Sequence, residues 1–230
     1  PISKFAVEFY KDENMEEIMS GKIPKNFNGN EFAFQAFKEG AKIIVTEETK
    51  YNNPQFFIVT DVLKCLQKLA EKHRDNLNIP IIAITGTNGK TSTKNLIASI
   101  LKTKLHVSST LGNLNNHIGL PLTILSIEKH HEIAVLEFGA SKLGDIKELC
   151  EISKPTHGII TNIGKAHLEE FQNISNIIKT KTELWSYLIK NKGTIFLNNE
   201  ESILKDTFIK SATYSQYKKI IYFGKEIDKI

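Results

Sequence analysis

The 230-residue sequence has few of the residues that mark disulfide-rich or zinc-binding proteins. It contains two cysteines, Cys65 and Cys150, which lie far apart and without the CxxC spacing of a metal or redox motif. Both fall among apolar residues with helical spacing. We therefore interpret them as reduced core thiols of a cytoplasmic protein, rather than as a disulfide or a zinc site.

Long apolar runs and a one-sided charge distribution are missing as well. No stretch approaches the roughly 18 apolar residues that span a bilayer, and the polar start, PISKFAVEFYKDEN, is unlike a secretion signal. Lys and Arg number 30 against 26 for Asp and Glu, and the positive side chains are spread along the chain. These absences argue against a membrane span and against nucleic acid as a partner.

What remains is the composition of a globular protein, with 40% apolar and 24% charged residues. The length suits one large domain or two small ones. Residues 1–26 are polar and irregular, with only a weak helix signal. Residues 27–60 predict a small α/β unit. Its expected elements are a helix over 31–38 that stops at Gly40, and strands over 42–46 and 56–60.

The rest of the chain alternates between strands and helices. Asp61 is the expected cap of a helix whose apolar stripe is Val62, Leu66, Leu69 and Ala70. The later strands are apolar without alternation, which is typical of a parallel sheet covered by helices on both faces. Strands are predicted over 81–85, 133–136, 158–163 and 194–197, and helices over 91–104, 144–152 and 176–190. We expect an α/β fold with domains 1–76 and 77–230, and a ligand beyond the carboxyl ends of the strands.

The strongest local signal is a loop between a buried strand and a helix that carries Leu96, Ile97 and Ile100 on one apolar side. Its small and polar residues are Gly86, Thr87, Asn88 and Gly89. Such a loop lets backbone N–H groups curve around a polyphosphate, while Lys90 reaches the outer phosphates and Thr91 offers a hydroxyl to Mg²⁺. The loop is tighter than a full GxxxxGK[ST] motif, which would need glycine at Ile84. A plain Gly/Asn turn is the alternative, but a turn does not require Lys-Thr at the start of a helix.

Two later strands lead to residues suited to the same site. Glu137 follows four apolar strand residues and precedes Gly139, so we predict that it binds the phosphate-bound Mg²⁺. The alternative is a solvated acid at a strand end. His167 follows the strand over 158–163 and could bind a second Mg²⁺ or a phosphate, although a loop histidine is more often a surface residue.

One lysine occupies an unexpected helical position. Ile177, Leu184 and Leu188 share a face of the helix over 176–190, and Lys181 takes the remaining place in that apolar stripe. Lys179 points away from the stripe. A lysine in such a stripe usually extends to water, so this helix alone leaves a structural and a functional Lys181 equally open.

Together these motifs resemble the Mur ligases, the ATP-dependent amide-forming enzymes of peptidoglycan precursor synthesis. The asparagines before His117, and Ala166 directly before His167, favour the members that add D-alanyl-D-alanine to UDP-MurNAc-tripeptide. The same features argue against a sister ligase or folylpolyglutamate synthase. The similarity covers about residues 27–199. The matching stretches are GTNGKTSTK, GNLNNHIGLPLT, LEFGA and TNIGKAHLEEF.

The resemblance implies ATP and Mg²⁺ as cofactors and a role for each matched residue. It implies that Lys90, Lys181 and His167 are catalytic. Residues 86–92, including Ser92, would bind the phosphates of ATP, and Asn198 would face adenine. Lys181 matches a lysine that the family carbamylates. The implied metal ligands are Thr91, Glu137, His167 and carbamylated Lys181, and the implied substrate-binding residues are Asn113, Asn115, Asn116 and His117.

The resemblance also implies a reaction through an acyl phosphate, carried out by a monomer on small-molecule substrates. Residues 1–26 lack the Asp-Ser-Arg segment usual in the family's N-terminal domain, and the family's C-terminal domain would follow Ile230. We therefore expect the gene to continue beyond this chain, which would be a fragment without full activity. A nucleotide-binding module without ligase activity is the alternative from another class.

Overall fold

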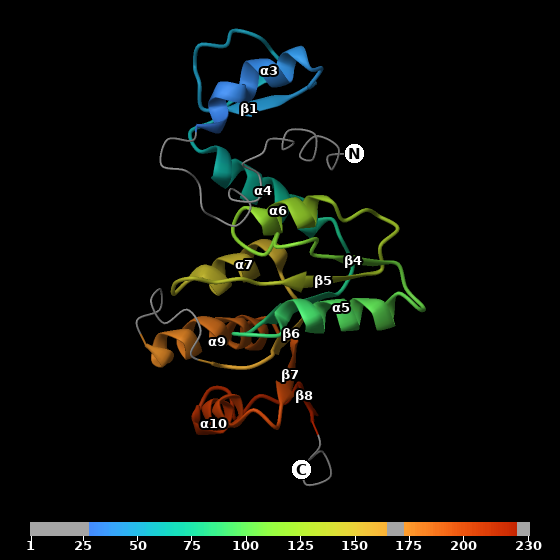
Figure 1. Ribbon diagram of the computed structural model, residues 1–230, viewed down its shortest axis with the longest axis vertical. Coiled ribbons are helices and arrows are strands. Elements are labelled where there is room, and N and C mark those ends of the chain that lie inside the picture. Colours follow the sequence, from blue (N-terminus) through green and yellow to red (C-terminus); the bar gives the residue numbers. More distant parts are fainter. Residues whose placement is uncertain (1–27, 165–172, 225–230) are drawn as a thin grey trace.

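The computed structural model describes residues 28–164 and 173–224, and Figure 1 shows a small N-terminal unit beside a larger parallel sheet. In the small unit the two strands pair in parallel, with Ile44 opposite Phe56. Gly40 ends the helix with φ +94°, as predicted. Its elements are η1 (Gly29–Phe32), α3 (Ala33–Lys38), β1 (Ile44–Thr46) and β2 (Phe56–Ile58). The weak helix signal of residues 1–26 and the site residue His167 lie outside the described residues.

The larger unit is a six-stranded sheet in the order β4-β5-β3-β6-β7-β8, in which each neighbouring pair is parallel. This confirms the predicted α/β fold. Its strands are β3 (Ile81–Thr85), β4 (Val107–Ser109), β5 (Ile133–Glu137), β6 (His157–Ile160), β7 (Thr194–Asn198) and β8 (Ile220–Phe223). Its helices are α4 (Val62–Asp75), α5 (Lys90–Leu101), α6 (Gly119–Leu125), α7 (Asp145–Ser153), α9 (Ile174–Lys190) and α10 (Ser202–Lys210). The elements that the sequence did not predict are β4, α6, α10 and β8.

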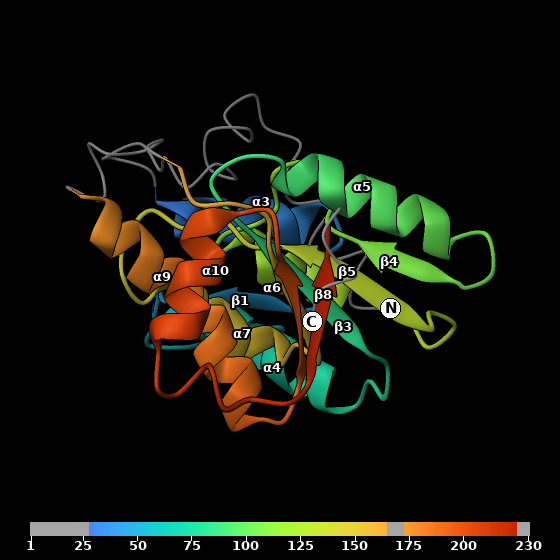
Figure 2. The same cartoon turned by 90° about the horizontal axis from the view of Figure 1, so that it is seen from below.

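Helices cover both faces of the sheet, and Figure 2 shows α5 on one side and α4, α7 and α9 on the other. On the α5 side, Ala98 packs with Ile84 and Val135 in a small core. On the other side, a larger core joins the sheet to α4, α6, α7, α9 and α10. Strand β3 lies inside the sheet between β5 and β6, so the loop that follows it emerges between the ends of those two strands.

Helix α5 buries a different face from the one that its apolar residues predicted. On α5, Leu96 and Ile100 are 63% and 60% exposed. The buried stripe instead runs through Lys94 and Ala98, because the small alanine lets the helix approach the sheet closely and the spacing of four residues carries Lys94 inward. The predicted side of α5 was therefore wrong.

On α4, Asp61 caps the helix as predicted, its carboxylate accepting from the Lys64 amide at 2.7 Å. Leu69, however, is exposed, because the buried positions are Ala70 and Arg74, one turn apart. Cys65 is only half-buried, so it is not a core thiol. Cys150 is buried as predicted, and both cysteines are free.

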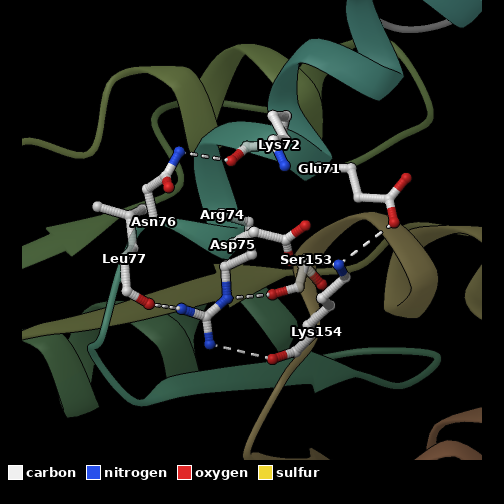
Figure 3. Close-up of polar contacts among 8 residues, drawn as sticks. All are labelled: Glu71, Lys72, Arg74, Asp75, Asn76, Leu77, Ser153 and Lys154. Atoms are coloured by element: carbon white, nitrogen blue, oxygen red, sulfur yellow. Dashed lines mark hydrogen bonds and ion pairs between the residues drawn. The ribbon is translucent and has the colours of Figure 1, made fainter.

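A buried arginine of α4 donates hydrogen bonds to carbonyls at the end of α7, as Figure 3 shows. Arg74 donates from Nε to the Ser153 carbonyl at 2.8 Å and from Nη2 to the Lys154 carbonyl at 3.2 Å. Its Nη1 donates to the Leu77 carbonyl at 2.7 Å. Burial lowers the pKa of Arg74. Helix α4 thus packs with the sheet unit, while the domain boundary at residue 76 stays a prediction.

Candidate functional site

The candidate site is built around the loop between β3 and α5. Gly86 has φ +147°, and a Cβ there would lie 1.9 Å from the Thr161 Oγ1, so no side chain fits. Gly89 has φ +77° and stands immediately before the first residue of α5. The first N–H groups of a helix have no intrahelical acceptor, and they carry partial positive charge. The loop therefore has the backbone shape and the polarity of a phosphate-binding loop.

The end of β6 holds this loop in place. The Thr87 and Asn88 amides donate to the backbone oxygen and to the side-chain Oδ1 of Asn162, both at 3.0 Å. In return, the Asn88 carbonyl accepts from Thr161 Oγ1 at 2.7 Å and from Asn162 Nδ2 at 3.0 Å. Sequence reasoning did not single out Thr161 and Asn162 as loop supports. The only signal was a pair of polar residues where an apolar strand ends.

Lys90 opens α5 and folds back over the loop. Its Nζ donates to the carbonyls of Gly86 and Thr87 at 3.0 and 3.1 Å. Burial lowers the pKa of Lys90, and the charge of Glu137 partly opposes that effect. Two carbonyls of the loop thus hold the Lys90 ammonium, and Lys90 lines a cavity of about 470 Å³.

A carboxylate and a hydroxyl meet beside this lysine. Thr91 Oγ1 donates to Glu137 Oε2 at 2.8 Å, and Asn115 Nδ2 donates to Glu137 Oε1 at 2.9 Å. Glu137 is 3% exposed. Gly139 allows Asn115 this close approach, because a Cβ there would lie 2.7 Å from the Asn115 Oδ1. Hydroxyl and carboxylate oxygens are hard ligands of the kind that Mg²⁺ takes together with phosphate oxygens and water.

The cavity gathers most of the predicted site residues. It is lined by residues 87–92, which include Ser92, and by Gly112, Asn113, Asn115 and Glu137. Two of the four predicted substrate-binding residues, Asn116 and His117, are absent from this lining. Asn116 lies three residues before the first residue of α6, and its Oδ1 accepts from the Ile118 and Gly119 amides at 3.0 and 2.9 Å. The carbonyl of His117 accepts from Gln67 Nε2 at 3.1 Å.

Asn198 lies at the end of β7, next to the strand that supports the loop. Its Nδ2 contacts the Thr161 carbonyl at 3.5 Å, and its Oδ1 accepts from the Glu200 amide at 3.1 Å. The residue predicted to face adenine therefore sits at the same carboxyl edge of the sheet as the phosphate loop.

Lys181 is buried, as one of the two interpretations of its stripe required. It is 5% exposed, while Lys179 is exposed. Ile177 and Leu184, on the same face of α9, are 1% and 0% exposed. Burial first, and the charge of Lys90 second, lower the pKa of Lys181 to about 8. The lysine side chain is therefore inward-facing and close to the phosphate loop.

Two features are absent from residues 28–164 and 173–224. Within these ranges no three His, Cys, Asp or Glu side chains are grouped to hold a metal by themselves. A phosphate-bound Mg²⁺ does not need such a group, because it keeps substrate oxygens and water. No helix in the same ranges is long and apolar enough to cross a membrane.

Comparison with known proteins agrees with this geometry. Residues 84–229 match the family described as the Mur ligase middle domain. The UDP-N-acetylmuramoyl-tripeptide–D-alanyl-D-alanine ligase of Bacillus subtilis is 37% identical over 187 residues, which are 80% of this chain and 41% of that protein. The enzyme of the same name from Buchnera aphidicola (strain Bp) is 40% identical over 177 residues, 76% of this chain and 38% of its own.

Solved structures give the same result. The MurF ligase of Thermotoga maritima in complex with ADP superposes with a TM-score of 0.78 at 35% identity, covering 89% of this chain and 46% of that one. A MurF structure from Acinetobacter baumannii reaches the same TM-score at 28% identity, over 88% and 44% of the two chains. The chain thus spans less than half the length of these relatives.

Proposed function

This chain belongs to the Mur ligase family, and from that premise we propose that it carries the nucleotide-binding part of an ATP-dependent ligase. The proposed reaction joins D-alanyl-D-alanine to UDP-MurNAc-tripeptide in peptidoglycan precursor synthesis. The names of the curated relatives and of the superposed MurF structures support this choice of substrates. Because those relatives are more than twice as long as the matched region, the complete reaction would need more chain than the residues described above.

One observation carries the proposal, namely the contact between Thr91 and Glu137 at the mouth of the phosphate loop. The hydroxyl and the carboxylate oxygen are 2.8 Å apart, and both line the cavity with Lys90. A loop that is only a turn has no reason to bring a buried carboxylate to the first turn of its helix. In a nucleotide site this arrangement serves a cation that is shared with the phosphates.

Mg²⁺ is part of the proposal. Thr91 and Glu137 would hold it, and it would neutralise charge on the transferred phosphoryl group. Asn115 would keep the Glu137 carboxylate turned toward Thr91, since its amide already donates to the other carboxylate oxygen. The predicted second metal ligand, His167, lies outside the described residues.

The chemistry that these residues must serve is an in-line transfer between two anions. The terminal carboxylate of the tripeptide attacks the γ-phosphorus of ATP, and the bond to the bridging oxygen breaks, leaving an acyl phosphate and ADP. The amine of D-alanyl-D-alanine then adds to the acyl carbon, and the tetrahedral intermediate releases phosphate. Lys90 and the N–H groups at the start of α5 would hold the phosphates and spread their charge.

Lys181 would act as a carbamate. With a pKa of about 8, a substantial fraction of the amine is neutral near pH 8, and neutral amines add CO₂ to give a carbamate and a proton. The product carries negative charge where the lysine carried positive charge. It would therefore be attracted to Lys90 and could help to hold Mg²⁺.

The substrate contacts are extensions of the same proposal. Asn113 lines the cavity beside the phosphate loop, where it could meet the reacting end of the tripeptide. Asn198 stands at the same edge of the sheet and would contact adenine. Asn116 and His117 would bind substrate as well; the Asn116 side chain also accepts from amides at the start of α6, and the His117 backbone carbonyl accepts from the Gln67 side chain.

The nucleotide part can be tested on the 230-residue chain. We expect a fluorescent ADP analogue to bind with an affinity that rises when Mg²⁺ is added. Lys90→Ala should weaken binding by about tenfold or more, because it removes a charged donor. Lys102→Ala, an exposed lysine near the end of the same helix, should leave it unchanged. If Lys90→Ala binds the analogue as tightly as wild type, the loop is only a turn.

The ligase part requires the complete product of the gene. Phosphate release from ATP is measured with both UDP-MurNAc-tripeptide and D-alanyl-D-alanine, with each alone and with neither. Release only with both substrates supports the proposal. Release that depends on neither indicates a nucleotide-binding module without ligase activity, and release with a different amine indicates a sister ligase.

A further inference from the structure

Lys94 is a buried cation that none of the roles above uses. It lies on α5 one turn after Lys90 and is 4% exposed. Its Nζ donates to the backbone carbonyl of Thr110 at 2.6 Å. Burying an ammonium is unfavourable unless strong hydrogen bonds compensate it, and an apolar side chain would fill the same space without that cost. Packing alone therefore does not explain a lysine at this place.

Thr110 is the point where three parts of the site meet. Its hydroxyl accepts from the Glu137 amide at 3.0 Å, and its own amide donates to the Val135 carbonyl at 3.2 Å. It is 2% exposed. Directly after it comes the segment that brings Gly112, Asn113 and Asn115 to the cavity. Through Thr110, α5 is thus joined both to the end of β5 and to the base of this segment.

The connection reaches both sides of the Glu137 carboxylate. On one side, Thr91 lies three residues before Lys94 on the same helix and donates to Glu137 Oε2. On the other side, Asn115 belongs to the segment that starts at Thr110 and donates to Glu137 Oε1. If the contact between Lys94 and Thr110 were lost, α5 could shift relative to both the Glu137 backbone and Asn115.

We propose that Lys94 is a positioning residue for the divalent-cation site formed by Thr91 and Glu137. Its charged hydrogen bond to Thr110 sets the distance between the Thr91 hydroxyl and the Glu137 carboxylate. This inference rests on the proposed function, since it assumes that a cation binds there with a nucleotide. It assigns Lys94 no contact with the nucleotide, whose phosphates are held by the loop and by Lys90.

The test separates metal affinity from nucleotide affinity. A fluorescent ADP analogue is titrated without metal, and Mn²⁺ is then titrated into the ADP complex and followed by electron paramagnetic resonance. Two variants change Lys94 itself: Lys94→Met keeps the length of the side chain, and Lys94→Arg keeps the charge. Thr110→Val keeps the carbonyl that Lys94 binds and removes the hydroxyl that accepts from the Glu137 amide. Lys102→Met, on the exposed end of α5, is the matched control.

We expect Lys94→Met to weaken Mn²⁺ binding by about tenfold or more, as is typical for residues that orient a metal ligand. Metal-free ADP binding should stay within about twofold of wild type, and Lys94→Arg should restore most of the Mn²⁺ affinity. Thr110→Val should weaken Mn²⁺ as well. The double variant Lys94→Met with Thr110→Val should be no weaker than the poorer single variant, because both act through one connection.

Several outcomes would overturn the inference. One is unchanged Mn²⁺ affinity in Lys94→Met. Another is a loss of metal-free ADP affinity in Lys94→Met as large as its loss of Mn²⁺ affinity, because Lys94 would then support the fold in general. If Lys94→Met shows no cooperative unfolding transition, it is not folded, and Thr110→Val becomes the test. Unchanged Mn²⁺ affinity in Thr110→Val then contradicts the inference. A wild-type chain that binds no ADP would reject the proposed function as well, whereas normal wild-type binding with unaffected variants rejects the role of Lys94 alone.

Discussion

Lys181 of α9 lies buried within electrostatic reach of Lys90 of the phosphate loop. Burial and the charge of Lys90 together lower the pKa of Lys181 to about 8. These two cations repel each other, and the repulsion falls if an anion binds near them or if one cation changes sign. Polyphosphate binding would do the first and the proposed carbamylation of Lys181 would do the second, so this pair of lysines suits the proposed phosphoryl transfer in either state.

The first prediction concerns stability against pH in CO₂-free buffer. An unfolded lysine has a pKa of about 10.4, so between pH 8 and pH 10.4 the unfolded state binds more protons and stability rises with pH. At pH 7 both states are protonated and the full penalty of the buried charge applies. We expect Lys181→Met to raise the free energy of unfolding at pH 7 by up to about 3 kcal/mol. The gain should shrink as the pH approaches 10.

Urea unfolding can be followed by the fluorescence of Trp185, the single tryptophan of the sequence. Trp185 is buried and packs against Phe208 and Tyr214, so its emission should change on unfolding. Lys179→Met, on the exposed side of the same helix, is the control and should show no pH-dependent difference. A gain from Lys181→Met that stays constant from pH 7 to 10 would contradict the lowered pKa.

The second prediction concerns the carboxylate. Glu137→Gln keeps the size of the side chain and removes its charge. ADP binding without Mg²⁺ should remain, while the increase in affinity caused by Mg²⁺ should fall by about tenfold, or about 1.4 kcal/mol. Calorimetric titrations with and without MgCl₂ measure both. Glu151→Gln, whose side chain is 62% exposed, is the control, and an intact Mg²⁺ effect in Glu137→Gln would exclude this carboxylate as a ligand.

The third prediction concerns the start of the loop. Gly86→Ala places a methyl group 1.9 Å from Thr161 Oγ1, so the loop and the end of β6 must separate. We expect a loss of at least about 2 kcal/mol of stability, together with loss of ADP binding. Gly40 also has a positive φ, +94°, but no atom lies within 4 Å of a carbon added there, so Gly40→Ala should cost only about 1 kcal/mol. Equal effects of the two substitutions in urea unfolding would rule out the steric explanation.

The fourth prediction concerns the attachment of α4. Arg74→Ala leaves three carbonyls, of Ser153, Leu77 and Lys154, without their charged donor. Unsatisfied buried groups are costly, and we expect a loss of about 2–4 kcal/mol in the free energy of unfolding. Lys72→Ala, an exposed residue of the same helix, should stay within about 0.5 kcal/mol of wild type. A loss below about 1 kcal/mol for Arg74→Ala would show that apolar packing holds α4 without it.

The parts of the site that are local in sequence could be predicted from it. The phosphate loop was recognisable because its glycines, Lys90 and Thr91 stand in one short stretch between a strand and a helix. Glu137 was recognisable because it ends an apolar strand, which places it at the edge where parallel strands bring their ligands. The apolar stripe placed Lys181 on the inward face of its helix, but it could not decide between a lysine that extends to water and a buried, functional one.

The parts that depend on distant contacts could not be predicted. Nothing near Asn162 indicates that it holds the phosphate loop, because its partner Asn88 is 74 positions away. The face of α5 was misjudged because Lys94 is buried by its bond to Thr110, against the usual preference of lysine for water. Strand β4 was missed because its sequence, Val-Ser-Ser, lacks an apolar run. Helix α6 was missed because Gly119 and Pro121 are ordinarily turn residues.

The position of β3 inside the sheet has a consequence for how the chain is made. The phosphate loop leaves the ribosome well before β6, yet the atoms that hold Asn88 belong to Thr161 and Asn162. At about 5–20 residues per second, the 74 positions between Asn88 and Asn162 take about 4 to 15 s to synthesise. During that interval the nascent loop has its glycines but lacks the supports that shape it. Nucleotide should therefore bind only to chains whose translation has passed β6.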